Sequence, residues 1–254
     1  MSRSTRLLAV LQLFESGGAV RTVEQIGRNL KMPASTAYRY VRDLVQAGFL
    51  DPVEGAGYAL GPAFIRYDRI LRQKDPLVRI ADPVMADLLI RTSQSATAIL
   101  CRRFKECVMC VHEVHGNKPH APTSYERGVA MPMFLGATSK VILAHLPDRA
   151  LRSIYLTNET VIRKVLRTKD WSDFRAQLKE IRRAGFALTD SEVAEGRIGL
   201  AAPIVREGHA IASLSLVIAG AGAGKKAAGF TPYVVAAAER LSQELTTKRT
   251  IISR

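Results

Sequence analysis

The stretch from Thr22 to Leu60 places the strongest constraint on how this chain folds. Thr22 and Gln25 form the T-x-x-Q pattern of a capping box, in which each side chain binds a backbone N–H at the start of a helix. Apolar residues then recur at helical spacing as far as Leu30. Pro33 follows a short turn and suits the start of a new helix, where its missing N–H costs nothing. The pattern therefore predicts two short helices joined by a tight turn.

The second helix of this pair has two different faces. Its inner face is apolar and consists of Ala37, Val41, Leu44 and Val45. Its outer face is polar and consists of Ser35, Tyr38, Arg39 and Arg42. No carboxylate lies on the outer face, and its hydroxyl, phenol and guanidinium groups are the kinds that bind base edges and phosphates. An ordinary helical hairpin with a solvated basic face is the alternative interpretation.

The segment after this helix predicts a two-stranded wing. Gly48 is placed to end the helix as a C-cap glycine, and residues 49–53 and 58–60 pair around a turn broken by two glycines. A winged helix-turn-helix is a DNA-reading device. We expect Ser35, Thr36, Tyr38 and Arg39 nearest the bases. The remaining predicted DNA-binding residues are Arg21, Thr22 and Arg42, of which the two arginines are expected on phosphate.

The net charge supports this interpretation less than its size suggests. The 254 residues carry a formal charge of +14, which attracts polyanions. Residues 1–61, however, hold 7 Lys/Arg and 5 Asp/Glu, a net charge of only +2. The excess lies mainly in the second half, where a solvated surface, an anionic ligand or contacts to flanking DNA all remain possible. The helix-turn-helix pattern must therefore carry the DNA-binding hypothesis.

The cysteine count and the hydropathy pattern predict a cytoplasmic protein. Three cysteines, an odd and small number, give no disulfide framework and suit a reducing compartment. The first residues lead into an amphipathic helix, expected over residues 4–16, and not into the apolar core of a signal peptide. No apolar run approaches the length of a membrane span, so no membrane partner is expected.

The rest of the chain predicts a linker and a second domain. Residues 62–74 have the pattern of a connecting helix, and Asp75-Pro76 breaks it because the residue before a proline avoids the helical region. We therefore expect a DNA-binding domain at 1–61, a linker helix at 62–76 and a second domain at 77–254. Strands are expected at 96–101, 107–114, 186–189, 198–205 and 210–218. Helices are expected at 77–92, 137–145, 148–155, 159–168, 171–184 and 231–247.

The order of these elements indicates the fold class of the second domain. Several strands are followed by helices with no regular βαβ alternation, which is typical of an α+β fold. The whole chain is thus predicted to be α+β, with an N-terminal winged helix-turn-helix.

Several short motifs, in this order and spacing, resemble the IclR family of bacterial transcription regulators. In the first domain they are Pro33-x-Ser-Thr-x-x-Arg39, Leu44-x-x-Ala-Gly-Phe-Leu50 and Tyr58-x-Leu-Gly61. In the second domain they are Gly136-Ala-Thr-Ser-Lys140, Glu195-Gly196, Ala201-Ala-Pro203 and Ala212-Ser-Leu-Ser215. The resemblance implies a C-terminal GAF-like α/β effector domain that binds a small organic or aromatic acid. It also implies a homodimer or a dimer of dimers on double-stranded operator DNA, regulating a small-molecule catabolic operon.

The resemblance, together with the strand and helix pattern, implies an effector pocket. Its candidate residues are Ala137, Thr138, Asp190, Gly199, Ser213 and Ser215. Residues 136–139 lead into a helix whose free N–H groups suit a carboxylate, and Ser213 and Ser215 share one face of a strand. Helix capping by Thr138 and ordinary burial of the two serines are the alternative. Arg197 and Gly199 stand at positions that vary in the family, so the resemblance names no particular ligand.

Other motifs give no catalytic site. Cys107 and Cys110, three residues apart on a strand, are expected on opposite faces, whereas Cys110 and His112 are expected to share a face, which leaves a metal site with Cys101 open. The glycine-rich segment 220–225 lacks the residues of a phosphate-binding loop and is expected to be a flexible loop. We therefore predict no enzyme, no cofactor and no metal. The alternative is a metabolite-binding or enzymatic GAF-like protein whose winged head makes protein contacts.

Overall fold

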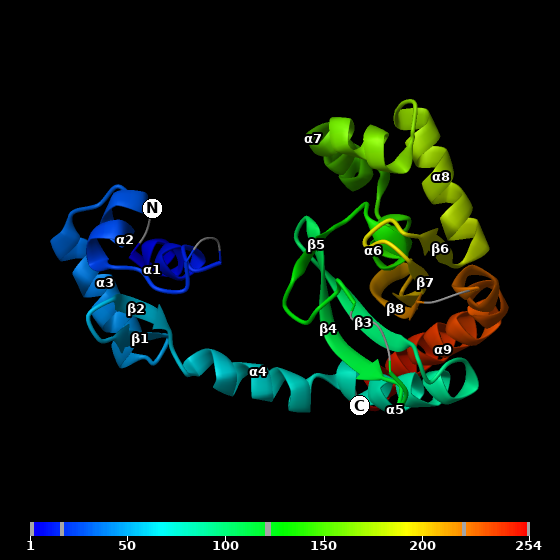
Figure 1. The fold of residues 1–254 in the computed structure, drawn as a ribbon, viewed down its shortest axis with the longest axis horizontal. Coiled ribbons are helices and arrows are strands. Elements are labelled where there is room, and N and C mark those ends of the chain that lie inside the picture. The colour runs from blue at the N-terminus through cyan, green and yellow to red at the C-terminus, as the bar shows by residue number, and fades with distance from the viewer. Residues whose placement is uncertain (1–2, 16–17, 120–122, 220–221, 253–254) are drawn as a thin grey trace. The chain divides into compact units, whose positions relative to one another are not determined.

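The structure, a computed structural model, describes residues 3–15, 18–119, 123–219 and 222–252. The chain divides into two compact units, Met1–Asp75 and Pro76–Arg254, whose elements are labelled in Figure 1. The break falls at the predicted Asp75-Pro76 step. The finer division into 1–61, 62–76 and 77–254 stays a prediction.

The first unit is the predicted winged helix-turn-helix. It contains α1 (Arg3–Gln12), α2 (Val23–Asn29), α3 (Ala34–Gln46), β1 (Leu50–Val53), β2 (Gly57–Leu60) and α4 (Ala63–Lys74). The capping box at α2 is formed, with Gln25 N donating to Thr22 Oγ1 at 3.3 Å and Thr22 N donating to Gln25 Oε1 at 2.9 Å. Helix α1 ends earlier than expected, and residues 16–17 lie outside the described part.

The end of α3 fixes where the wing begins. Gly48 has a φ of +76°, a conformation that glycine adopts at little cost. The Phe49 N–H donates to Leu44 O at 2.8 Å and the Gly48 N–H donates to Val45 O at 2.9 Å. This pair of bonds is a Schellman cap, and it turns the chain directly into β1, which pairs antiparallel with β2.

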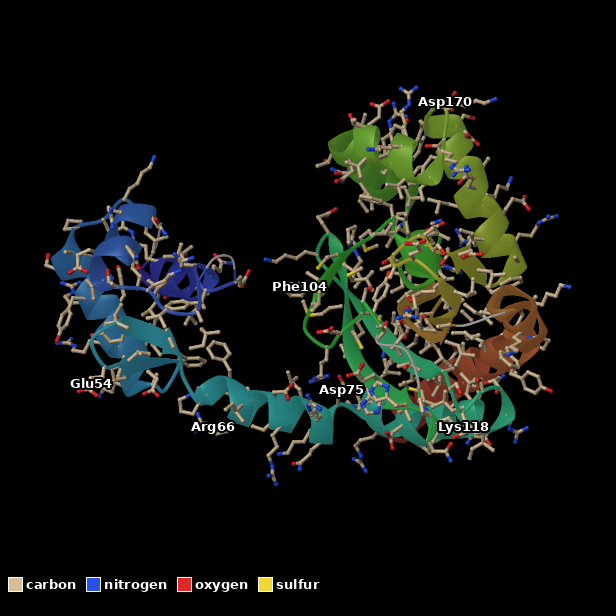
Figure 2. The ribbon with its side chains drawn as sticks, in the orientation of Figure 1. Glu54, Arg66, Asp75, Phe104, Lys118 and Asp170 are labelled. Atoms are coloured by element: carbon tan, nitrogen blue, oxygen red, sulfur yellow. The ribbon has the colours of Figure 1, made fainter. Side chains whose placement is uncertain are left out.

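Helix α4 differs from the other helices of this unit because it is almost entirely exposed. Its side chains, Arg66 among them, project away from the helix along its length (Figure 2). Five of these exposed side chains are large and apolar, namely Phe64, Ile65, Tyr67, Ile70 and Leu71.

The second unit is built on a six-stranded antiparallel sheet with the order β5-β4-β3-β8-β7-β6. Its strands are β3 (Thr97–Phe104), β4 (Cys107–His115), β5 (Ala130–Pro132), β6 (Ala187–Asp190), β7 (Arg197–Arg206) and β8 (His209–Ala219). Its helices are α5 (Pro76–Arg91), α6 (Gly136–Leu143), α7 (Asp148–Leu166), α8 (Trp171–Ala184) and α9 (Ala223–Ile252). The predicted α+β class is confirmed. Within the described part of the chain, no helix combines the length and the apolar character that crossing a bilayer requires.

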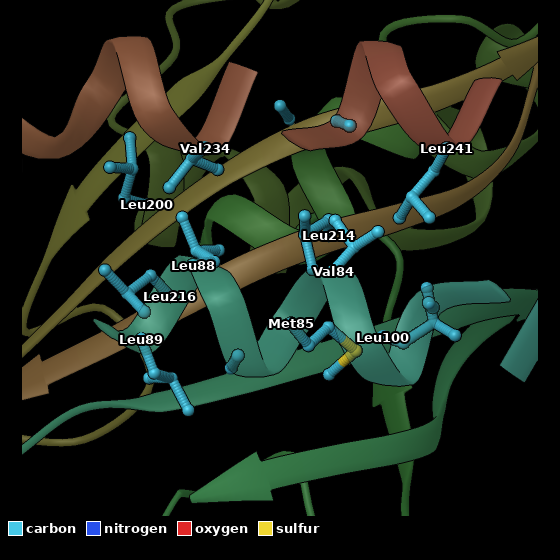
Figure 3. Close-up of a cluster of buried hydrophobic side chains, with 14 of the residues drawn as sticks. Val84, Met85, Leu88, Leu89, Leu100, Leu200, Leu214, Leu216, Val234 and Leu241 are labelled. Carbon is cyan, nitrogen blue, oxygen red and sulfur yellow. The ribbon is translucent and has the colours of Figure 1, made fainter. Parts of the chain in front are cut away.

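Each face of the sheet is covered by its own helices. Helices α5 and α9 cover one face, and Figure 3 shows Leu88 of α5 and Val234 of α9 in the cluster with Leu200, Leu214 and Leu216 of the sheet. Helix α6 packs on the other face, α8 packs on α6 and α7 packs on α8, so that side chains such as Ile142, Ile154 and Phe174 are buried in a second cluster. The sheet is therefore the middle layer of three.

The prediction for the last helix needs correction. Helix α9 begins at Ala223, well before the expected residue 231, and runs through Pro232. Burial of Ala223 and Ala227 against the sheet outweighs the low helix propensity of the glycines and the proline. The expected flexible loop is therefore wrong from Ala223 onward, and its first residues, 220–221, lie outside the described part. The two helices expected at 148–155 and 159–168 form α7 together, joined by a kink at Asn158, whose φ of −125° and ψ of 17° are not helical.

The core beneath α5 gives a prediction about stability. Leu88 is 2% exposed, whereas Ile90 on the same helix is 74% exposed. Leu88→Ala should lower the free energy of unfolding by about 2–5 kcal/mol, because a cavity is left in close-packed surroundings. Ile90→Ala should change it by less than about 0.5 kcal/mol. Urea unfolding of the full chain measures both, and equal losses would contradict this placement of the core.

Candidate functional site

Helix α3 presents the predicted polar face to solvent. Ser35, Tyr38, Arg39 and Arg42 are all exposed, and Tyr38 retains 53% of its accessible surface. The opposite face contributes Ala37, Tyr40, Val41 and Leu44 to the core of the head. The periodicity of the sequence thus separates the two faces, apart from Tyr40, which it did not assign. The exposed groups can donate to both base edges and phosphates.

The other three predicted DNA-binding residues are less open. Thr36 is half-buried, and the Thr22 hydroxyl is already engaged in the capping box. Arg21 is also half-buried: its backbone exchanges two 2.9 Å hydrogen bonds with Tyr58, and its guanidinium lies 6.0 Å from the Phe14 ring. These contacts tie Arg21 and Thr22 to the fold of the head. Their contact with DNA, like that of the α3 residues, stays a prediction.

A carboxylate lies closer to the reading face than the sequence analysis expected. Asp43 Oδ1 is 3.6 Å from an Arg42 guanidinium nitrogen. An ion pair this exposed contributes little free energy, so a phosphate can compete with it. Arg39 is the guanidinium on this face without such a carboxylate neighbour among the described residues.

The second unit has a cavity at the amino end of α6. It is lined by residues from four segments: Thr123, Ser124 and Tyr125; Gly136, Ala137 and Thr138; Thr189, Glu192, Val193, Ala194, Arg197 and Gly199; and Val217. Its free volume is about 30 Å³, room for only a few atoms. Three of the predicted effector residues, Ala137, Thr138 and Gly199, therefore meet at one cavity.

Two glycines allow α6 to approach the sheet this closely. Gly136 has a φ of +75°, and a Cβ there would lie 2.7 Å from Val193 Cγ2 and 3.0 Å from the Tyr125 hydroxyl. A Cβ on Gly199 of β7 would lie 3.1 Å from Thr189 Oγ1 and 3.5 Å from the Ala137 Cβ. Any larger residue at either position would have to push the walls of the cavity apart.

The N–H groups at the start of α6 are already engaged within the chain. Gly136 N donates to Glu192 Oε2 at 3.1 Å, and Ala137 N donates to Thr189 Oγ1 at 3.2 Å. Lys140 Nζ also donates to Glu192, through Oε1 at 2.5 Å. The sequence analysis expected these N–H groups to be free for an effector carboxylate. The internal carboxylate of Glu192 holds the favourable position at the positive end of this helix.

The remaining predicted effector residues lie around the cavity and do not line it. Ser215 is fully buried behind Thr138, whose hydroxyl donates to Ser215 Oγ at 2.9 Å. Ser213 is buried further along β8, and its hydroxyl has no hydrogen-bond partner among the described residues. Asp190 is exposed and accepts a bond from Ser191 Oγ at 2.7 Å. Strand alternation explains the exposure of Asp190, because Thr189 faces the cavity and the next residue of the strand must face away from it. An effector contact by these three residues stays a prediction.

Several lining residues were missed by the sequence analysis. Tyr125 comes from the expected loop, and its hydroxyl donates to Leu135 O at 2.7 Å and lies 2.9 Å from Ser139 Oγ. Burial raises the pKa of the Tyr125 phenol well above its usual range. Glu192, Val193 and Ala194 lie on the turn between β6 and β7. A turn or loop has no periodicity that marks its inward side chains, so only the charge of Glu192 and Arg197 was visible beforehand.

The cysteines are arranged differently from the expectation. A register shift between Leu100 and Cys101 places Cys110 opposite Cys101 and His112 opposite Leu100. Because Cys101 and Leu100 belong to cores on opposite faces of the sheet, Cys110 and His112 do not share a face. His112 Nε2 lies 2.7 Å from Asp82 on α5. Burial raises the pKa of Cys101, and the hydrogen bond with Cys101 lowers the pKa of Cys110. In the described part of the chain, no three His, Cys, Asp or Glu side chains cluster in a way that could hold a metal.

A winged head with an exposed polar helix face and a separate unit with a small cavity are the arrangement of a transcription regulator. Comparison with family models agrees: residues 5–54 match the IclR helix-turn-helix domain, and residues 71–245 match the bacterial transcriptional regulator IclR C-terminal domain. The chain therefore belongs to the IclR family of transcriptional regulators, which confirms the resemblance found in the sequence.

Individual relatives are distant but span most of the chain. The HTH-type transcriptional regulator KipR of Bacillus subtilis is 23% identical over 81% of this chain and 81% of its own length. The Pca regulon regulatory protein of Pseudomonas putida is 22% identical over 85% of this chain and 74% of its own. A crystal structure of an IclR homolog complexed with 4-hydroxybenzoate, from Microbacterium hydrocarbonoxydans, is 20% identical with a TM-score of 0.70. That comparison covers 96% of this chain and 100% of the homolog.

The hydrogen bond behind the cavity can be tested by a double-mutant cycle. Thr138→Val and Ser215→Ala should each lower the free energy of unfolding by about 1–3 kcal/mol, because each leaves a buried hydroxyl without its partner. The double variant should lose clearly less than the sum of the two single losses. Urea unfolding measures all four proteins. Strictly additive losses would show that the two hydroxyls do not interact.

Proposed function

We propose that this protein is a ligand-responsive transcriptional regulator, a repressor or an activator, of a small-molecule catabolic operon. Its effector is a small organic or aromatic acid. The observation that carries the proposal is the small cavity beside α6, mostly apolar with a few polar groups, in a chain that also exposes the polar face of α3. Such a protein acts in the cytoplasm, where operator DNA is found and where its three free cysteines stay reduced.

Operator binding by α3 is supported by the chemistry and exposure of its outer face. Arg39 and Tyr38 are both exposed near the middle of the helix. An arginine there can donate two hydrogen bonds to a guanine edge in the major groove. The head carries little net charge, so a few placed side chains, more than general attraction to phosphate, would determine which sequence is bound.

An acidic effector is supported by the cationic wall of the cavity and by one similar structure. Arg197 supplies a guanidinium, while Ala137, Val193 and Val217 supply apolar surface. Ligand sites commonly combine apolar walls with a few directed polar groups. The homolog from Microbacterium hydrocarbonoxydans is complexed with 4-hydroxybenzoate, an aromatic acid. The cavity of this chain holds only a few atoms, so an acid of that size would require side chains such as Val193 to move.

A homodimer, or a dimer of dimers, is supported by helix α4. Its five large apolar side chains are exposed in a single copy, and burying such a stripe against a second copy would be favourable. Two heads held by paired α4 helices would read an operator with two half-sites. Effector binding would then shift the population of head spacings and so change operator affinity.

The alternative is a metabolite-binding or enzymatic GAF-like protein whose head contacts other proteins. It requires the polar face of α3 to contact a protein in place of DNA. A gel shift with the DNA flanking its own gene separates the two functions, and a specific shifted band that responds to candidate acids supports the regulator. A protein that retards this DNA no better than unrelated DNA would favour the alternative.

The role of Arg39 gives a quantitative prediction. Arg39→Ala should weaken operator binding by about 1–3 kcal/mol and relax the discrimination between bases at one position. The matched control is Arg183→Ala, which removes an exposed guanidinium from α8 in the other unit. This variant should bind the operator like the wild type. Titration of operator variants, followed by fluorescence anisotropy, measures both effects. An unchanged affinity and footprint for Arg39→Ala would rule out base reading by this residue.

A further inference from the structure

Arg197 is a cation at the cavity that the fold of the chain does not use. It is the first residue of β7 and lies two residues before Gly199. Because strand residues two apart share a face, both line the same cavity. The Nε of Arg197 is buried and has no hydrogen-bond partner among the described residues. Buried polar atoms are nearly always hydrogen-bonded, so an exception of this kind needs an explanation.

The acidic side chain in the cavity lining, Glu192, forms no ion pair with Arg197. Its Oε1 accepts from Lys140 Nζ at 2.5 Å and its Oε2 accepts from Gly136 N at 3.1 Å. Both carboxylate oxygens of Glu192 thus accept hydrogen bonds from residues of α6. None of the ion pairs formed among the described residues includes Arg197. Arg197 is therefore a cation of the cavity lining without an ion-pair partner among the described residues.

The helix end beside Arg197 is a weaker receptor for an anion than it would be if it were open. The N–H groups of Gly136 and Ala137 already donate to Glu192 and Thr189. An incoming carboxylate would have to displace Glu192, which is itself held by Lys140. Displacement exchanges one carboxylate for another and gains little. The guanidinium of Arg197, in contrast, can donate to an anion from Nε without breaking a hydrogen bond within the described part of the chain.

We propose that Arg197 is the anion receptor of this cavity and that the effector places its carboxylate on that guanidinium. The inference rests on the regulator function proposed above. A planar guanidinium matches a carboxylate with two parallel hydrogen bonds, and Nε is one of the donors of that fork. The apolar side chains of Ala137, Val193, Ala194 and Val217 surround the rest of the space. The class of ligand is thus a monocarboxylic acid with a short apolar body.

The unpaired Nε of Arg197 also affects the stability of the protein without ligand. A buried nitrogen without a partner destabilises the folded state. Replacing Arg197 by a neutral residue should therefore raise the unfolding temperature of the unliganded protein. If Arg197 were a structural residue, the same replacement would lower it. Residues placed for binding at the expense of stability show this opposition.

The test uses the full-length protein and two pairs of probes that differ only in charge, propionate with propionamide and benzoate with benzamide. Calorimetric titration and thermal unfolding are applied to the wild type, Arg197→Gln and Arg197→Lys. Arg206→Gln is the control, because Arg206 ends the same strand and lies outside the cavity lining.

The proposal expects at least one acid to bind the wild type and raise its unfolding temperature while its amide does not. Arg197→Gln should lower the binding affinity for that acid by about 10- to 100-fold, the range for a lost charged hydrogen bond. Arg197→Lys should retain part of the affinity, and Arg206→Gln should retain all of it.

Three results would overturn the proposal. They are wild-type affinity of Arg197→Gln for the acid, equally tight binding of acid and amide by the wild type, and failure of both acids to bind the wild type. None of them touches operator recognition, which the gel shift tests separately. If the Arg197→Gln protein binds its operator and still responds to an acid, the regulator function stands and the role of Arg197 as anion receptor is wrong.

Discussion

The close packing of α6 against the β6–β7 hairpin is the interaction on which the cavity, and with it the proposed effector site, depends. The positive φ of Gly136 and the missing Cβ of Gly199 let the first turn of α6 reach Thr189 and Glu192. These contacts satisfy the helix end within the chain, which leaves Arg197 as a cation of the cavity lining without an ion-pair partner among the described residues. One packing contact thus decides both where the cavity lies and which charge it offers to a ligand.

The two units divide the work of a regulator between them. The head owes its shape to local devices, the capping box at Thr22 and the Schellman cap at Gly48. It exposes the polar face of α3 but has little net charge, so in the proposed function a few side chains such as Arg39 would determine which sequence is bound. The second unit has the larger core and the cavity. Its helix α5 follows directly on the Asp75-Pro76 step, so this step and α4 form the covalent connection between the cavity unit and the head.

Features with a local physical cause could be predicted from the sequence. The cap at Thr22, the stop at Gly48 and the two faces of α3 each follow from a few neighbouring residues. The lining of the cavity was predicted only in part, because it joins residues far apart in the chain. Ala137, Thr138 and Gly199 meet there, but Tyr125, Thr189 and Glu192 come from a loop, a short edge strand and a turn. The register shift beside Cys101 left no mark in the sequence, and it reversed the expected face of His112. Helix α9 extended through glycines because burial outweighs local propensity.

The central claim is that the cavity and the operator site are coupled, and linkage tests it most directly. If an acid changes the operator affinity of the wild-type protein by some factor, the operator must change the affinity for that acid by the same factor. Both affinities can be measured by calorimetry and fluorescence anisotropy on the same protein, with operator DNA and acid titrated in either order. The account predicts equal factors, typically about 5- to 150-fold. An acid that binds the cavity with the same affinity in the presence and absence of operator would contradict it.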